Sequence, residues 1–312
     1  MLAILATTFP FFALVLCGYI AVRRRMLPQL AIPGMNSFVL YFALPCLLYR
    51  FGATTPLAQL LDPGVFGVYL LSGLLCVAVV TVLSRSRRLD WNNAAFGALV
   101  AAFPNTGFMG VPLLLALLGP RSSGPVIVTL VVDLIVITSL CIALSRFGQG
   151  GSAAALRHAL AGMVRNPMPW AIALGGLASA MAFDLPGPVM RTVGLLADAA
   201  SPVALFTIGA VLARSHMNAS TATPLADALP VALAKLLLHP LLMAGIGHAA
   251  LAAGVPLDPF ALRVLILVAC LPSASNVVLL AERFGADTGR IALIILLSTA
   301  LSFVTFSAAV TF

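Results

Sequence analysis

Residues 103–112, FPNTGFMGVP, bring helix-breaking and hydrogen-bonding residues into an otherwise apolar run. Pro104 lacks a backbone N–H and clashes with the preceding turn, so we expect a helix to unwind there. The polar and small residues beside that break are Asn105, Thr106, Gly107 and Gly110. Side-chain amides, hydroxyls and N–H groups at a helix start donate hydrogen bonds without adding a fixed charge. The segment therefore predicts a site that binds an anion reversibly.

A second interrupted segment, ACLPSASNVVLLAERFG, covers residues 269–285. Its break is expected at Pro272, and its polar residues are Ser273, Ser275 and Asn276. Unwound backbone at membrane depth is tolerated only where it is buried in protein or lines a wet cavity. Two interrupted helices in matching positions of a chain are a sequence signal for a transport site. The alternative is that the prolines only kink two helices and the small residues allow tight packing.

Four ionisable residues fall inside apolar runs: Asp133, Asp198, Lys235 and His239. Charges are costly in hydrocarbon, so each is expected to face the protein interior or a partner. For Asp133 and Lys235, a structural ion pair and a role in substrate or proton coupling stay open. Asp198 is either solvated or internal, and His239 is either a packed residue or a titrating one.

The composition identifies the class of protein that must position these residues. Of 312 residues, 62% are hydrophobic and 8% charged, with a mean hydropathy of +1.12. A soluble domain carries about 25% charged residues, so this chain is predicted to be an integral membrane protein. Strict two-residue alternation is absent, which argues against a membrane barrel. Single cysteines in apolar runs predict no disulfide, metal or cofactor site.

Ten apolar runs are candidate membrane helices. They cover residues 3–22, 33–50, 65–84, 94–118, 124–146, 167–183, 187–213, 228–251, 261–284 and 290–311. With the N-terminus outside, twelve arginines fall on the inner side and four on the outer side. The inner ones are Arg23, Arg24, Arg25, Arg85, Arg87, Arg88, Arg146, Arg157, Arg165, Arg214, Arg283 and Arg290. This bias predicts a multi-pass protein of the cell (inner) membrane with both termini outside, and the net charge of +8 needs no nucleic-acid partner.

The chain divides into two five-helix halves, residues 1–146 and 167–312, joined by a cytoplasmic loop at 147–166. An odd number of helices in each half requires the second half to enter the membrane inverted. LPCLLYRFG in the second run aligns without a gap with SPVALFTIG in the seventh. Matching prolines, leucines and glycines at corresponding runs indicate an internal repeat. The predicted fold is thus all-α, with ten helices in two inverted repeats and breaks in the fourth and ninth.

The motif NTGFMGVP resembles the hallmark of the auxin efflux carrier family of membrane transporters. FVLYFALPCLLYRF, SPVALFTIGAVL, KLLLHPLL and LPSASNVVLLAERFGAD extend the resemblance over essentially the whole chain. The short central loop is similar to that of the bacterial, malonate- or malate-transporter-like members. The resemblance implies scaffold and transport domains, broken helices that cross, elevator-type movement and a homodimer. It also implies that Asn105 is the polar residue at the crossing point, between the breaks at Pro104 and Pro272.

These observations predict a secondary active transporter, not an enzyme, for a small organic anion. The substrate is expected to be a carboxylate, either a dicarboxylate such as malonate or malate or an auxin-like acid. Coupling to a proton or a sodium ion, or to neither, stays open, as does the direction of transport. An anion channel is the main alternative, because channels also use broken helices. An intramembrane protease is a weaker alternative, since the expected G-x-G-D and G-x-S-G contexts are absent. A non-transporting membrane sensor is also weaker, because both interrupted segments keep their motifs.

Overall fold

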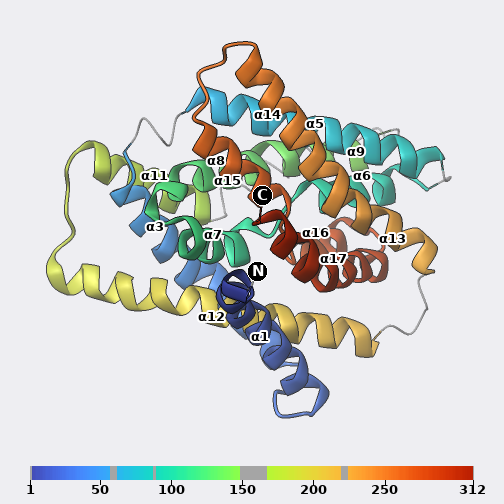
Figure 1. The fold of residues 1–312 in the computed structure, drawn as a ribbon. Coiled ribbons are helices and arrows are strands. Elements are labelled where there is room, and N and C mark those ends of the chain that lie inside the picture. Colours follow the sequence, from blue (N-terminus) through green and yellow to red (C-terminus); the bar gives the residue numbers. More distant parts are fainter. Residues whose placement is uncertain (1, 57–61, 87–88, 148–166, 219–223, 312) are drawn as a thin grey trace. The chain divides into compact units, whose positions relative to one another are not determined.

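The computed structural model describes residues 2–56, 62–86, 89–147, 167–218 and 224–311. Every regular element within these ranges is a helix (Figure 1). The α-helices are α1 Leu2–Arg23, α2 Ala31–Phe38, α3 Leu44–Thr54, α5 Pro63–Ser86, α6 Trp91–Ala102, α7 Val111–Leu118, α8 Ser123–Val131, α9 Thr138–Ser145, α11 Pro167–Ala180, α12 Gly187–Asn218, α13 Leu225–Leu233, α14 His239–Ala252, α15 Pro259–Ala269, α16 Val277–Phe284 and α17 Thr288–Ala309. The short η elements are η1 Val39–Ala43, η2 Thr106–Gly110, η3 Pro120–Ser122, η4 Val132–Ile137 and η5 Ala234–Leu238, of which η3 is a 3₁₀ turn and the others are π-helical.

Six continuous helical stretches are long and apolar enough to cross a membrane, judged by length and composition. They are Ala31–Thr54, Pro63–Arg85, Pro120–Ser145, Gly187–Arg214, Leu225–Ala252 and Thr288–Ala309. Shorter apolar helices cover Phe9–Arg23, Thr106–Leu118 and Pro259–Ala269. The prediction of an all-α, multi-pass membrane protein is confirmed, while the ten-helix inverted arrangement stays a prediction. The predicted loop at 147–166, apart from Phe147, lies outside the described residues, as do Arg87, Arg88, Arg157 and Arg165.

The chain forms two compact units, each assembled from separate stretches of sequence. Unit 1 contains Met1–Asp62, Gly107–Val128 and Arg165–Asn218, and unit 2 contains Pro63–Thr106, Thr129–Val164 and Ala219–Phe312. Each unit therefore takes helices from both predicted halves of the chain. The chain passes from unit 2 to unit 1 after Thr106 and back to unit 2 after Val128.

Glycines let the helices of unit 1 approach backbone to backbone. A Cβ atom added to Gly209 of α12 would fall on the carbonyl oxygen of Val15 in α1, far inside van der Waals contact. A Cβ atom added to Gly52 of α3 would lie 3.0 Å from the carbonyl oxygen of Ile172 in α11. Small residues are the usual means of close helix packing in membranes, where hydrophobic burial supplies little driving force.

These two close contacts are one contact repeated along the sequence. Gly52 and Gly209 are 157 positions apart. Gly52 meets Ile172 and Gly209 meets Val15, and these two partners are also 157 positions apart. A second pair repeats in the same way. The added Cβ of Gly18 would meet the carbonyl of Phe206, and that of Gly175 would meet the carbonyl of Tyr49.

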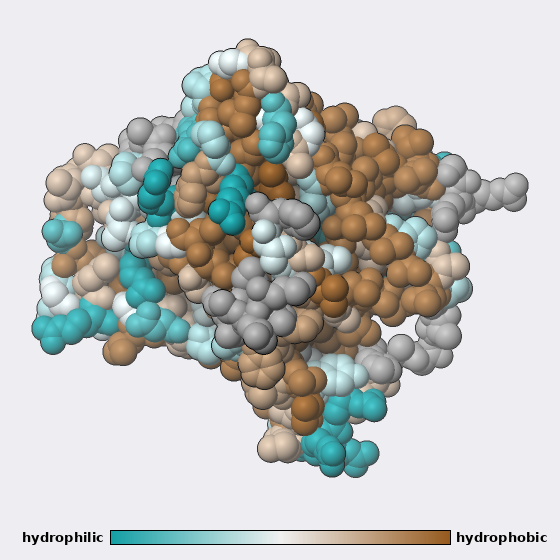
Figure 2. All heavy atoms as spheres, in the orientation of Figure 1, coloured by the Kyte–Doolittle hydropathy of each residue, from teal (hydrophilic) through white to brown (hydrophobic). Residues whose placement is uncertain are grey.

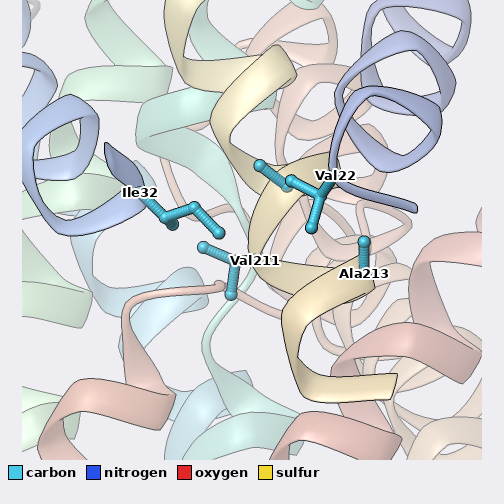
Figure 3. Close-up of a cluster of buried hydrophobic side chains, with 5 residues drawn as sticks. Val22, Ile32, Val211 and Ala213 are labelled. Carbon is cyan, nitrogen blue, oxygen red and sulfur yellow. The ribbon is translucent and has the colours of Figure 1, made fainter. Parts of the chain in front are cut away.

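An apolar cluster joins three elements of unit 1 (Figure 3). Val22 of α1, Ile32 of α2 and Val211 of α12 are buried there together with Ala210 and Ala213. Tyr19 and Leu27 pack against this cluster from its edge. The turn Arg24–Leu30 between α1 and α2 is thereby tied to α12, and the three exposed residues Arg23, Arg24 and Arg25 follow directly at the end of α1.

In unit 2, two short helices start on an aspartate cap. The side chain of Asp90 accepts a hydrogen bond from the backbone N–H of Asn93 at the start of α6, and that of Asp258 accepts one from Phe260 at the start of α15. Such caps satisfy N–H groups that the first helical turn leaves open. The caps lie 168 positions apart, so α6 and α15 begin in the same way.

Large apolar side chains remain exposed on the long helices of unit 2. Figure 2 shows them as brown spheres gathered over α5 and α13, where exposed residues include Phe66, Leu75, Val82 and Leu233. A soluble monomer rarely exposes contiguous apolar patches of this kind. Their presence agrees with helices that face lipid.

Candidate functional site

The break in each interrupted segment, at residues 103–106 and 270–276, lies in unit 2, and the two breaks meet there. Helix α6 ends at Ala102 and α15 ends at Ala269. Between the two breaks, Pro104 and Ser273 form an isolated antiparallel bridge. The backbone N–H of Asn105 donates to the carbonyl of Pro272 at 2.8 Å, and that of Ala274 donates to the carbonyl of Phe103 at 3.0 Å. The two unwound strands thus satisfy part of each other's backbone.

A helix break at Pro104 is expected to free backbone N–H groups near Thr106 and Gly107, but the N–H group of Thr106 has a partner within the protein. The Thr106 N–H donates to the carbonyl of Pro104 at 2.8 Å. On the other strand, the Ser273 N–H donates to the side-chain oxygen of Ser298 at 3.2 Å. A buried backbone donor without a partner is costly, so the fold pairs these groups within the protein. Ligand contacts at these residues must therefore come mainly from side chains.

The side chains at the same breaks are buried and unpaired. Four oxygen atoms there have no hydrogen-bond partner within the described structure: Asn105 Oδ1, Thr106 Oγ1, Ser273 Oγ and Asn276 Oδ1. Asn105 is 2% exposed, and Thr106 and Ser273 are fully buried. An amide can be turned so that its NH₂ group takes the place of its oxygen, and a hydroxyl can either donate or accept. Buried polar groups are normally hydrogen-bonded, so four neighbouring side-chain oxygens without a partner need an explanation.

The other residues predicted for this site are Ser275, Gly107, Gly110, Pro104 and Pro272. Ser275 and Asn276 are half-buried in the turn before α16. Gly107 and Gly110 lie in η2, in the part of the chain that belongs to unit 1. Pro104 and Pro272 lie within the two breaks, as predicted from their effect on a helix.

Three of the four ionisable residues, Asp133, Lys235 and His239, are buried in unit 2, and the first two lie on π-helical turns. Asp133 lies in η4, and its Oδ2 accepts a hydrogen bond from the hydroxyl of Tyr69 at 2.8 Å. Lys235 lies in η5, and its Nζ donates to the carbonyl of Ala269 at 2.7 Å and contacts His239 Nδ1 at 3.1 Å. The Tyr69 and His239 rings are 6.3 Å apart, so the four side chains form one cluster. Single π-helical turns are frequent at functional sites.

Asp133 and Lys235 do not contact each other directly. Within the described part of the chain, the only ion pair closer than 4.0 Å joins Arg50 and Asp198 in unit 1, at 2.8 Å. The Asp198 side chain is 69% exposed there. Asp198 is therefore a surface charge with a partner on α3, while Asp133 and Lys235 are held by neutral groups.

Some polar partners were not identified from the sequence. The Ser298 hydroxyl oxygen accepts from the Ser273 N–H at the second break, and the Tyr69 hydroxyl donates to Asp133. Arg50 pairs with Asp198. Each lies 25 to 148 residues from its partner, beyond the reach of any local pattern. Arg290, counted as a loop arginine, is buried at the start of α17 and donates to the carbonyls of Asn93 and Asp227. Arg290 is the first residue of the apolar run 290–311, a position that did not predict its burial.

Comparison with known proteins identifies the family. Residues 3–310 match the family described as "Membrane transport protein". The chain belongs to this family. Over 305 residues, this membrane transport protein is 30% identical to the "Putative malonate transporter" of Rhizobium meliloti (strain 1021), covering 95% of this chain and 91% of that one. It is 26% identical over 294 residues to the "Uncharacterized transporter YfdV" of Escherichia coli (strain K12), covering 89% and 88%.

The resemblance to the auxin efflux carriers is also confirmed. A stretch of 125 residues of this membrane transport protein is 32% identical to "Auxin efflux carrier component 3a" of Oryza sativa subsp. japonica. It covers 36% of this chain and 19% of the plant protein. The family is one of membrane transporters rather than enzymes, which agrees with the apolar helices of the fold.

Proposed function

We propose that this membrane transport protein is a secondary active transporter of a small organic anion, and that the anion binds at the paired breaks of unit 2. The observation that carries the proposal is the set of four unpaired, buried side-chain oxygens at those breaks. A carboxylate accepts hydrogen bonds only, so it would take donors from Asn105, Thr106, Ser273 and Asn276. A dicarboxylate such as malonate or malate, or an auxin-like acid, supplies enough acceptors for them.

The chemistry of these groups suits a ligand that must bind and leave. One hydrogen bond to a charged group contributes about 1.5–3 kcal/mol, and no fixed positive charge at the breaks would trap the anion. The name of the malonate-transporter relative favours a dicarboxylate for this chain. Malonate is therefore the first substrate to test.

We also propose the inverted-repeat arrangement for this fold. It is supported by contacts that repeat when the two halves are exchanged. In unit 1 the shift between equivalent residues is 157, as in Gly52 and Gly209. At the breaks the shift is 169, since the bond from Asn105 to Pro272 matches the bond from Ala274 to Phe103. Two repeats related by an approximate two-fold axis produce such exchanged contacts.

The division into units favours an elevator-type mechanism, in which unit 2 carries the substrate and unit 1 is the scaffold that forms a homodimer. All of the paired breaks lie in unit 2, and the backbone-to-backbone glycine contacts lie in unit 1. Both termini are proposed to lie outside the inner membrane, following the arginine bias. Cysteines added at each terminus should react with an impermeant reagent from outside, and inaccessible termini would contradict this topology.

An anion channel is the competing function. A carrier exposes its site to one side at a time, so its flux saturates and shows counterflow. A channel instead gives single-channel currents that do not saturate in the same range. These two results separate the functions without any knowledge of the coupling ion.

The test uses purified full-length protein and a panel of mono- and dicarboxylates. A ligand that binds the folded state raises the melting temperature by mass action. We expect malonate or a close dicarboxylate to raise it, and labelled malonate to show counterflow in proteoliposomes. Failure of every carboxylate to shift melting, together with absent counterflow, would refute the proposed substrate class.

A further inference from the structure

We propose that Asp133 is a proton-binding site and that the proton is the coupling ion of anion transport, acting through the charge of Lys235. This inference rests on the proposed function, because it names the ion that accompanies the anion. It concerns a cluster of unit 2 that touches neither Asn105 nor Ser273 directly in the described contacts.

The two helices that end at the breaks are capped by different groups. The carbonyl of Ala269, the last residue of α15, accepts from the Lys235 ammonium at 2.7 Å. Near the end of α6, the carbonyl of Ala101 accepts from the Cys76 thiol at 3.8 Å. A cation therefore caps only one of the two ends. Ala269 is three residues before Pro272, whose carbonyl holds the Asn105 N–H, so this cation lies close behind the proposed anion site.

The carboxylate of Asp133 has one open position in the same cluster. Its Oδ2 accepts from Tyr69, while its Oδ1 has no partner in the described structure. Since Lys235 donates to His239 Nδ1, a neutral His239 ring is assigned its proton on Nε2, where it cannot accept another. Asp133 Oδ1 is thus the open acceptor of the cluster. The other titratable groups that face Lys235 are the thiols of Cys76 and Cys270, and Cys141 lies near Cys76.

The groups around Asp133 fit a proton better than a sodium ion. Hard metal cations bind through several oxygen ligands. Here the carboxylate accepts from one phenol, and the other members of the cluster are one imidazole and one ammonium group, which repels a second cation. A proton needs one open oxygen atom, which Oδ1 provides.

The proposed coupling follows from the charge balance of the cluster. When Asp133 is ionised, its negative charge offsets that of Lys235. A proton taken from water on one side of the membrane forms an O–H bond at Oδ1, and the cluster then carries one uncompensated positive charge. In a low-dielectric interior that charge favours an anion at the neighbouring breaks. On the other side the O–H bond breaks as the anion leaves, and the proton returns to water.

Binding of the anion and of the proton must then favour each other by the same factor. The first experiment mixes malonate with purified full-length wild-type protein in weak buffer that contains a pH indicator. It is done above the second ionisation of malonate, so that the ligand stays a dianion. We expect proton uptake by the protein on binding, and an affinity that rises as the pH falls, by at most about tenfold per pH unit for one proton. Malonate binding without proton uptake and with a constant affinity would overturn the inference and leave the proposed function standing.

Substitutions assign the proton to its site. Asp133→Asn is expected to abolish proton uptake and to make the malonate affinity independent of pH. Asp198→Asn, which removes an exposed carboxylate of unit 1, is the matched control and should keep both responses. Replacement of sodium by choline should leave the malonate affinity and the proton uptake of the wild type and of Asp198→Asn unchanged. A requirement for sodium would contradict the proposal.

One readout needs no substrate and so separates this inference from the proposed function. Infrared difference spectra of the wild-type protein at falling pH should show the C=O stretch of a protonated carboxyl group that is missing in Asp133→Asn. Absence of that band in the wild type would overturn the proton site even if malonate is transported. If Asp133→Asn fails to fold, the proton uptake of the wild type still decides the matter.

Discussion

Unit 1 and unit 2 use buried polar groups in opposite ways. In the described part of unit 1 the buried polar residues carry only hydroxyl groups, such as Thr55 and Ser123, whose oxygens are 2.9 Å apart. In unit 2 a lysine, an aspartate, an arginine and a histidine are buried as well. All ten buried side-chain atoms that lack a partner in the described structure belong to unit 2.

The glycines show the same difference between the units. In unit 1 the backbone of a neighbouring helix lies against Gly18 of α1, Gly52 of α3, Gly175 of α11 and Gly209 of α12. In unit 2, Gly73, Gly97 and Gly247 face side chains, namely those of Ile137, Arg290 and Leu262. Backbone contacts cannot adjust, whereas side chains can change rotamer. We infer that unit 1 is built to keep one packing and that unit 2 is built to hold groups open for a ligand.

The largest effect is expected from removal of the buried ammonium group in unit 2. Lys235→Met leaves the carbonyl of Ala269 unpaired and the Asp133 charge uncompensated, which should lower the unfolding free energy by about 3–5 kcal/mol. Chemical unfolding in detergent measures the change. Arg263→Met, at an exposed position of α15, is the control and should have little effect.

The double variant Asp133→Asn with Lys235→Met tests whether the two charges interact across the cluster. We expect it to recover part of the stability that Lys235→Met loses, because the uncompensated carboxylate is gone. No recovery would mean that the cost lies entirely in the lost bond to Ala269 and that the two charges act independently.

The second prediction concerns ligand binding at the breaks of the same unit. Asn105→Ala should weaken malonate binding by about 10- to 150-fold, which corresponds to about 1.5–3 kcal/mol for one hydrogen bond to a charged group. Asn105→Asp should be worse, because a carboxylate repels an anion. Affinity and melting temperature are measured on the same purified variants, with Asn36→Ala of unit 1 as the control.

The outcome also decides between two roles for Asn105. If its side chain only supports the backbone near Pro104, alanine will lower the melting temperature and leave the affinity of the folded protein intact. Unchanged affinity in Asn105→Ala would therefore remove this residue from the site.

The third prediction tests the close packing of unit 1. Gly209→Ala drives a methyl group into the backbone of Val15 and should cost about 1–3 kcal/mol in stability. Gly194→Ala in the same helix has open space around the added atom and should be neutral or slightly stabilising. Equal effects of the two substitutions would contradict a rigid backbone contact.

The sequence predicted the breaks but not what completes them. Pro104 and Pro272 marked both interruptions, because proline acts on its own turn of helix and leaves a local signal. The repeat in LPCLLYRFG and SPVALFTIG indicated equivalent segments, and Gly52 and Gly209 within it are equivalent contacts in unit 1. The backbone pairing of the breaks joins residues more than 160 positions apart, so no local pattern could show that the Asn105 N–H binds the carbonyl of Pro272.

The placement of charges was the least predictable feature. Asp133 and Asp198 each stood in an apolar run, and the sequence left a solvated position open for Asp198 without deciding it. The structure buries one against Tyr69 and exposes the other beside Arg50. Which face of a helix points to lipid, protein or water depends on the neighbouring helices, and their order cannot be read from one run.

The smallest effect is expected for the exposed ion pair of unit 1. A double-mutant cycle with Arg50→Ala and Asp198→Ala should give a coupling energy of about 0.2–1 kcal/mol, because water screens a pair whose carboxylate is 69% exposed. The cycle is measured by unfolding in detergent and repeated at high salt, where the coupling should fall further. A coupling of about 3 kcal/mol or more would mean that the pair is sealed from water. Nothing in the described part of the chain covers Asp198 to that degree, so we would then test this surface of unit 1 as the contact of the proposed homodimer.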